Sequence, residues 1–191
     1  MNHLGHLLLS GDDPEVITGN FMADAVKGRD LSAHLPSVQR GIRLHRRIDT
    51  FTDTHPLTLE GRKRLWAHCG KFAGVALDLF YDHCIAVTWD GTLGTLEEFS
   101  ARMYTILTAH SELMPERTRR MLPYMVEGDW LTNYRGTDGI AWALRGLARR
   151  VPNAGALVGA ERLLIQHRDR YVAECTAFLA ELRKHLQREE G

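Results

Sequence analysis

Histidine and aspartate side chains recur at a spacing of one helical turn in residues 45–53. His45, Asp49 and Asp53 would share one face of a helix, because residues four apart are neighbours on its surface. Imidazole nitrogen combined with carboxylate oxygen suits a divalent ion such as Mn²⁺, Fe²⁺ or Zn²⁺. The alternative is a structural network in which Arg46 or Arg47 pairs with an aspartate. The spacing alone leaves both interpretations open.

A second stretch places Asp78 and Asp82 one turn apart, with His83 adjacent. The neighbouring residues are apolar, and two unpaired carboxylates would be costly to bury among them. Metal binding or general acid–base chemistry would explain the carboxylates. A buried pair with arginine, or a helix face turned to solvent, would make them structural instead.

A third polar face lies nearer the start of the chain, where Asn20 and Asp24 are one turn apart among small and apolar residues. His3 and His6 could lie beside it. The sequence has no GxxxxGK[ST] phosphate loop, no HExxH zinc motif and no GxSxG nucleophile motif. Metal-assisted hydrolysis is therefore the leading chemical interpretation.

The elements that must position these side chains are helices. Apolar residues recur at helical spacing, and the alternating runs typical of strands are missing. We expect an all-α fold, a single-domain helical bundle over residues 1–191, with a kink at Pro123. The expected helices span residues 14–27, 36–54, 56–68, 72–89, 96–110, 115–134, 139–150 and 156–187.

Composition narrows the class of protein. Of the 191 residues, 24 are basic and 24 acidic, so no overall charge favours binding to nucleic acid or to a membrane. The three cysteines have no CxxC spacing, which argues against a disulfide framework or a cysteine zinc site. With neither a signal peptide nor a long apolar run, the expected location is the cytoplasm.

Five blocks of residues, taken together, resemble the acyl carrier protein phosphodiesterase family. They are Asn2-x-Leu4-x-His6-Leu7, Gly19-Asn20-x-x-Ala23-Asp24-x-Val26-Lys27-Gly28, Gly41-Ile42-x-x-His45-Arg46-Arg47-Ile48-Asp49 with Thr52-Asp53, Leu77-Asp78 with Tyr81-Asp82-His83, and Trp130-Leu131-x-x-Tyr134. The sequence departs from the family at His3, Gly5 and Cys84. None of these changes removes a candidate ligand.

The resemblance implies a Mn²⁺- or Mg²⁺-dependent enzyme that removes the 4′-phosphopantetheine arm from holo-acyl carrier protein and releases the apo form. That family is similar to the HD-domain metal-dependent phosphohydrolases, so the bundle would be a divergent HD-domain-like fold. This sequence has no adjacent His-Asp pair. The ligands of the HD-domain enzymes therefore cannot be transferred to it by motif.

The resulting site hypothesis gives each candidate residue a role. The metal ligands would come from Asp24, His45, Asp49, Asp78, Asp82 and His83, with His6, Asn20 and Asp53 supporting them. Asp24 would be essential, and His83 or His45 would protonate the leaving serine oxygen. Arg46 or Arg47 would brace the phosphate, and Arg40 and Arg43 would meet the acidic carrier protein.

Two other functions remain open at this point. An HD-like phosphohydrolase acting on a nucleotide or a small phosphate ester would use the same ion and water. A non-catalytic helical scaffold, or a module that only binds the carrier protein, would have its acidic faces paired with arginine.

Overall fold

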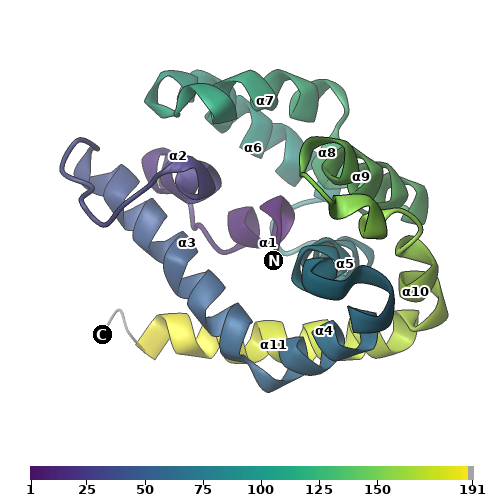
Figure 1. Cartoon of the computed structure of the whole chain (residues 1–191). Helices are drawn as coiled ribbons and strands as arrows, with labels where there is room; N and C mark the ends of the chain where they lie inside the picture. Colours follow the sequence, from purple (N-terminus) through teal and green to yellow (C-terminus); the bar gives the residue numbers. More distant parts are fainter. Residues whose placement is uncertain (189–191) are drawn as a thin grey trace.

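The computed structural model describes residues 1–188, so the last three residues of the expected domain lie outside it. Its regular elements are helices, which confirms the all-α prediction (Figure 1). In chain order they are α1 (His3–Leu8), α2 (Pro14–Met22), η1 (Ala23–Ala25), α3 (Pro36–Thr54), α4 (Pro56–Cys69), η2 (Gly70–Phe72), α5 (Ala73–Val87), α6 (Leu96–Ala109), η3 (Ser111–Leu113), α7 (Glu116–Glu127), α8 (Trp130–Asn133), α9 (Thr137–Arg150), η4 (Ala154–Leu157), α10 (Glu161–Gln166) and α11 (Arg168–Arg188).

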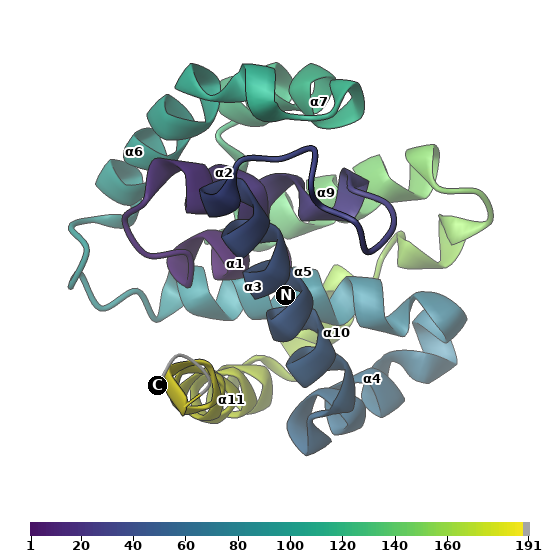
Figure 2. The ribbon, with the colours of Figure 1, turned by 90° about the vertical axis from the view of Figure 1, so that its left-hand side faces the viewer.

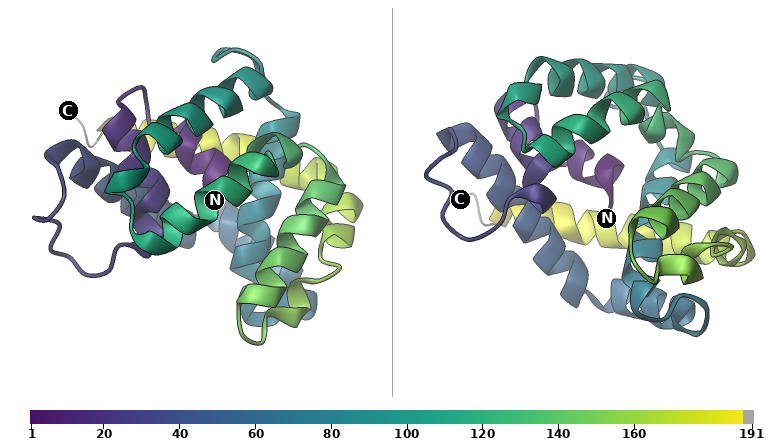
Figure 3. Two further views of the ribbon diagram at one scale, coloured as in Figure 1. Left: turned by 90° about the horizontal axis from the view of Figure 1, so that it is seen from above. Right: turned by 45° about the horizontal axis from the view of Figure 1, so that its top comes forward.

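The short helix α1 lies at the centre of the molecule, and the longer helices surround it (Figures 1 and 3). It contacts α2 and α5, while α3 packs along α2 and passes beside α1 (Figure 2). The last helix, α11, contacts α3, α4 and α5. Within residues 1–188, no helix combines the length and the apolar character needed to cross a membrane.

Asp82 of α5 stabilises the first turn of α1. Its fully buried carboxylate accepts hydrogen bonds from three backbone N–H groups, those of Asn2 (3.2 Å), Leu4 (2.8 Å) and Gly5 (3.1 Å). A helix of six residues is too short to be stable alone, and the N–H groups of its first turn have no partners within the helix. The carboxylate supplies those partners and attracts the positive end of the helix dipole.

Glycine allows α2 and α3 to pack with their backbones almost in contact. A Cβ atom on Gly41 would lie 2.2 Å from the carbonyl oxygen of Val16, and one on Gly19 would lie 2.2 Å from that of Val38. No side chain larger than hydrogen fits at either position. This close crossing places Asn20, the residue after Gly19, against α3.

The helix expected over residues 14–27 ends earlier than predicted. Asp13 caps its start, accepting hydrogen bonds from the backbone N–H groups of Glu15 and Val16. The α-helix stops at Met22, and the chain tightens into the 3₁₀ turn η1. The change of direction turns Asp24 away from the axis of α2.

Two expected long helices are also interrupted. Asp129 adopts a left-handed backbone conformation, with φ of 39°, and separates α7 from α8. In the segment expected to be helical from 156 to 187, Gly159 has φ of 87°, a conformation that suits glycine, and η4, α10 and α11 replace one helix. Pro123 lies inside α7.

We expect Gly41→Ala to destabilise the fold, because the added methyl group would meet a backbone carbonyl that cannot turn aside. The free energy of unfolding should fall by about 1–3 kcal/mol, measured by denaturant titration. Gly155→Ala is the matched control, since a Cβ there has no atom within 4 Å. Equal stability of the two variants would contradict the close crossing.

Candidate metal centre

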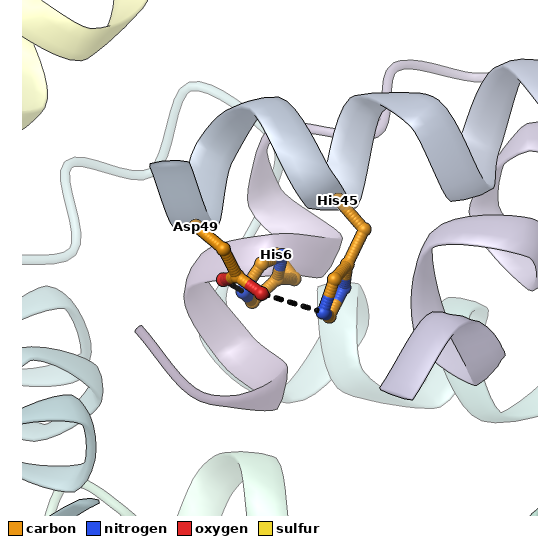
Figure 4. Close-up of side chains that lie close together, drawn as sticks. All are labelled: His6, His45 and Asp49. Carbon is orange, nitrogen blue, oxygen red and sulfur yellow. Dashed lines mark ion pairs between the residues drawn. The ribbon is translucent and has the colours of Figure 1, made fainter. Parts of the chain in front are cut away.

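His6, His45 and Asp49 bring three metal-binding groups together (Figure 4). The carboxylate of Asp49 bridges the Nε2 atoms of the two imidazoles, with Oδ1 3.2 Å from Nε2 of His6 and Oδ2 3.1 Å from Nε2 of His45. The two rings are stacked, with centroids 4.0 Å apart and planes 19° from parallel. Helix α1 supplies His6, and one turn of α3 supplies the other two residues.

Asn20 sets the orientation of both histidines. Its Oδ1 is 3.1 Å from Nδ1 of His6 and 3.0 Å from Nδ1 of His45, while its Nδ2 donates to the backbone oxygen of His6 and to Oγ of Ser10. Because the backbone oxygen only accepts, the amide group has one possible orientation, and its oxygen must accept from both rings. Each Nδ1 therefore carries the proton, so a neutral ring presents the lone pair of Nε2 to Asp49.

Asp24 reaches the same centre from η1. Its Oδ1 lies 3.2 Å from Nε2 of His45, and 84% of its side chain is exposed. A small pocket adjoins this contact. It is lined by Met1, Asn2, His3, His6, Asn20, Phe21, Asp24 and His45. Asp24 is thus the carboxylate of the centre most open to an incoming molecule.

The charges in the centre are strongly coupled. Burial alone would lower the pKa of His45, but its hydrogen bonds to Asp24 and Asp49 outweigh burial and raise the pKa to about 9. Burial would raise the pKa of Asp49, yet its hydrogen bond from His45 and the positive charge of that ring hold the pKa well below its usual value. The hydrogen bond with His45 lowers the pKa of Asp24. Burial lowers the pKa of His6.

These residues could hold a divalent cation. The centre contains two ionised carboxylates and one protonated histidine, so it carries a net charge of about −1. Replacing the His45 proton by a divalent ion would leave the centre neutral, with two imidazole nitrogens and carboxylate oxygen as donors. Such a donor set suits borderline divalent ions.

The second expected cluster does not join this centre. Asp82 is occupied by the N–H groups of α1, and burial, only partly offset by those hydrogen bonds, raises its pKa to about 7. Asp78 accepts a 3.0 Å hydrogen bond from the amino group of Met1. His83 Nδ1 lies 2.9 Å from the carbonyl oxygen of Tyr134. Three of the six expected ligands therefore lie apart from His45 and Asp49 in the structure. They are Asp78, Asp82 and His83.

The arginines expected near the phosphate have other contacts. Arg46 donates to the carbonyl oxygens of Val26 and Gly28, which fastens the loop after η1 to α3. Arg47 donates to the carbonyl oxygen of Leu186. Both contacts are structural.

Asp53 and the two arginines expected to dock the carrier protein lie on the outer part of α3. Asp53 pairs with Arg62 of α4, so it does not support His45 directly. Arg40 pairs with Asp13 at 3.0 Å, and Arg43 donates to Gln39 at 2.8 Å. Arg40 and Arg43 are exposed.

Sequence reasoning gave His6 only a supporting role, whereas the structure places its Nε2 on Asp49. Spacing could not reveal this, because α1 and α3 are distant in sequence. The one indication in the sequence was that His6 belongs to a block, Asn2-x-Leu4-x-His6-Leu7, that resembles the family. Asn20 hydrogen-bonds both histidines, and its support of a bound metal stays a prediction.

Comparisons with known proteins agree on one family. A family model described as acyl carrier protein phosphodiesterase matches residues 1–182. The chain is similar to proteins of that name from Photorhabdus laumondii subsp. laumondii (34% identity, covering 87% of this chain and 85% of the relative) and Yersinia enterocolitica (33%, covering 87% and 88%). One from Escherichia coli O6:H1 is 33% identical, covering 82% of each chain. No solved structure matches, so the HD-domain-like relation stays a prediction.

We expect Asn20→Ala to weaken Mn²⁺ binding by about 10- to 100-fold, the usual effect of losing a group that orients a metal-binding histidine. Isothermal titration calorimetry would measure it. Ser10→Ala is the control, because it removes a partner of the Asn20 amide nitrogen and leaves Oδ1 in place. Wild-type affinity in a folded Asn20→Ala variant would show that Oδ1 does not organise the centre.

Proposed function

Because this chain belongs to the acyl carrier protein phosphodiesterase family, we propose that the centre on α1 and α3 hydrolyses the phosphodiester bond of holo-acyl carrier protein, releasing 4′-phosphopantetheine and the apo-protein. The contact of Asp49 with both His6 and His45 carries this assignment. The acidic residues of this centre are paired with histidine, not with the arginines that a purely structural network would require.

We propose that His6, His45, Asp49 and Asp24 hold the cation, which we expect to be Mn²⁺ or Mg²⁺. The donor set suits a borderline ion such as Mn²⁺, since both Nε2 atoms and carboxylate oxygens converge. When bound, the ion would activate a water and offset negative charge on the phosphate oxygens.

Residues around the proposed cation would orient its ligands and the attacking water. Asn20 keeps both imidazoles in the orientation that directs Nε2 inward, and the carboxylate of Asp49 contacts both Nε2 atoms. Asp24 is ionised and sits at the open side of the centre, so it can accept a hydrogen bond from the attacking water and hold it toward the phosphorus.

The substrate must approach from the side of Asp24, where the centre opens. Acyl carrier proteins are acidic, and Arg40 and Arg43 are exposed cations on the same helix as His45. We keep these two residues as the proposed docking contacts, because exposed basic groups steer an acidic partner by long-range attraction.

The direct test is a mass measurement on the substrate. Incubation of holo-acyl carrier protein with the enzyme and Mn²⁺ should remove the mass of the phosphopantetheine arm. Asp49→Asn should lower kcat/KM by at least about 100-fold, because an amide offers one oxygen instead of two and carries no negative charge. Asp53→Asn, one turn along α3, should keep most of the activity, since Asp53 pairs with Arg62.

Two results would count against the assignment. Unchanged carrier protein together with turnover of nucleotides would favour the small-phosphate-ester alternative. Activity lost equally in Asp53→Asn and Asp49→Asn would place the reactive centre elsewhere on α3.

Metal affinity should rise with pH. A cation must displace the proton of His45, whose pKa is raised to about 9, so the apparent affinity should increase by up to about tenfold per pH unit below that value. Asp24 and Asp49 stay ionised in this range and add no slope. Calorimetric Mn²⁺ titrations between pH 6 and 8 would test this, and a flat profile would show that the cation does not compete with the His45 proton.

A further inference from the structure

Arg150 is a cation close to the pocket. It is the last residue of α9, and its guanidinium carbon lies 5.8 Å from the centre of the Trp130 ring. At that distance a cation is attracted to an aromatic face. The Trp130 ring lies 6.3 Å from the ring of His3, which lines the pocket with His6, Asp24 and His45. Arg150 is thus separated from the pocket wall by one aromatic ring.

The charge of Arg150 is available to a ligand. Its Nε donates to the carbonyl oxygen of Gly146 at 3.1 Å, and no carboxylate pairs with its guanidinium in the part of the chain that the structure describes. Arg46 and Arg47, by contrast, donate to backbone carbonyl oxygens. Both terminal nitrogens of Arg150 can therefore bind an anion.

The pocket needs such a cation. A divalent ion together with the carboxylates of Asp24 and Asp49 has no net charge, so an incoming phosphodiester would leave the centre with a net negative charge that a further cation can balance. His3, which lines the pocket, cannot supply this positive charge. Burial lowers the pKa of His3 to about 4, so His3 is neutral.

We propose that Arg150 binds a non-bridging phosphate oxygen of the substrate, with Trp130 as the surface that holds the guanidinium in place. This inference rests on the proposed function, because it takes the ligand to be a phosphate ester bound beside the metal centre. It assigns the bracing role to α9, whereas the sequence suggested Arg46 or Arg47. Arginine suits the role because its planar group can contact two phosphate oxygens at once.

The test compares Arg150→Gln with Arg149→Gln, a control on the neighbouring exposed residue of the same turn. With Mn²⁺ and holo-acyl carrier protein, Arg150→Gln should lower kcat/KM by about 10- to 100-fold, mainly through KM, as expected for the loss of hydrogen bonds to a charged group. Arg150→Lys should recover part of the loss. Arg149→Gln should stay within about twofold of wild type.

Ligand binding gives a second readout that is independent of turnover. Arg150→Gln should weaken the affinity for 4′-phosphopantetheine, measured by calorimetry, and should leave the affinity for pantetheine, which lacks the phosphate, unchanged. Equal phosphopantetheine affinity and kinetics in folded Arg150→Gln and wild-type protein would overturn the proposal. If the wild type left the carrier protein intact, the proposed function would fail. A selective loss of inorganic phosphate binding in Arg150→Gln would still support Arg150 as the anion-binding residue.

Discussion

The arrangement of this protein depends on the buried carboxylate of Asp82. Its three hydrogen bonds to the start of α1 keep a six-residue helix folded at the centre of the molecule, and that helix carries His6. Burying a carboxylate is costly, and the N–H groups offset the cost by replacing the water it loses. Asp82 therefore serves the candidate metal centre indirectly, because it fixes the helix that carries His6.

A second constraint links the remaining parts of the site. One oxygen of Asn20 accepts from both imidazoles, and the glycines of α2 and α3 bring Asn20 close enough to do so. The centre thus lies where α1, α2 and α3 meet. A small shift of any of these helices would break a hydrogen bond that sets a ring orientation. The close packing of α1, α2 and α3 is therefore also what holds the two imidazole rings in their orientation.

Much of the fold follows from the sequence, because its signals are local. Pro14, Pro36 and Pro56 each begin a helix as predicted, and the i,i+4 pair of His45 and Asp49 shares one face of α3. The failures have a common physical cause. Whether a carboxylate such as Asp82 meets a metal or a distant backbone N–H depends on tertiary contacts that spacing does not encode. The same holds for Arg46, whose partners are carbonyl groups of a loop.

The dependence of α1 on α5 also bears on biosynthesis. The ribosome makes the His6 segment long before Asp82, and a helix of this length does not persist without its distant partner. The nascent chain therefore carries an unstructured leading segment until α5 has emerged and docked. The histidines cannot converge before then, so a partly synthesised chain has no organised cation site. Formation of the candidate site is therefore a late event, which requires that the middle of the protein has already folded.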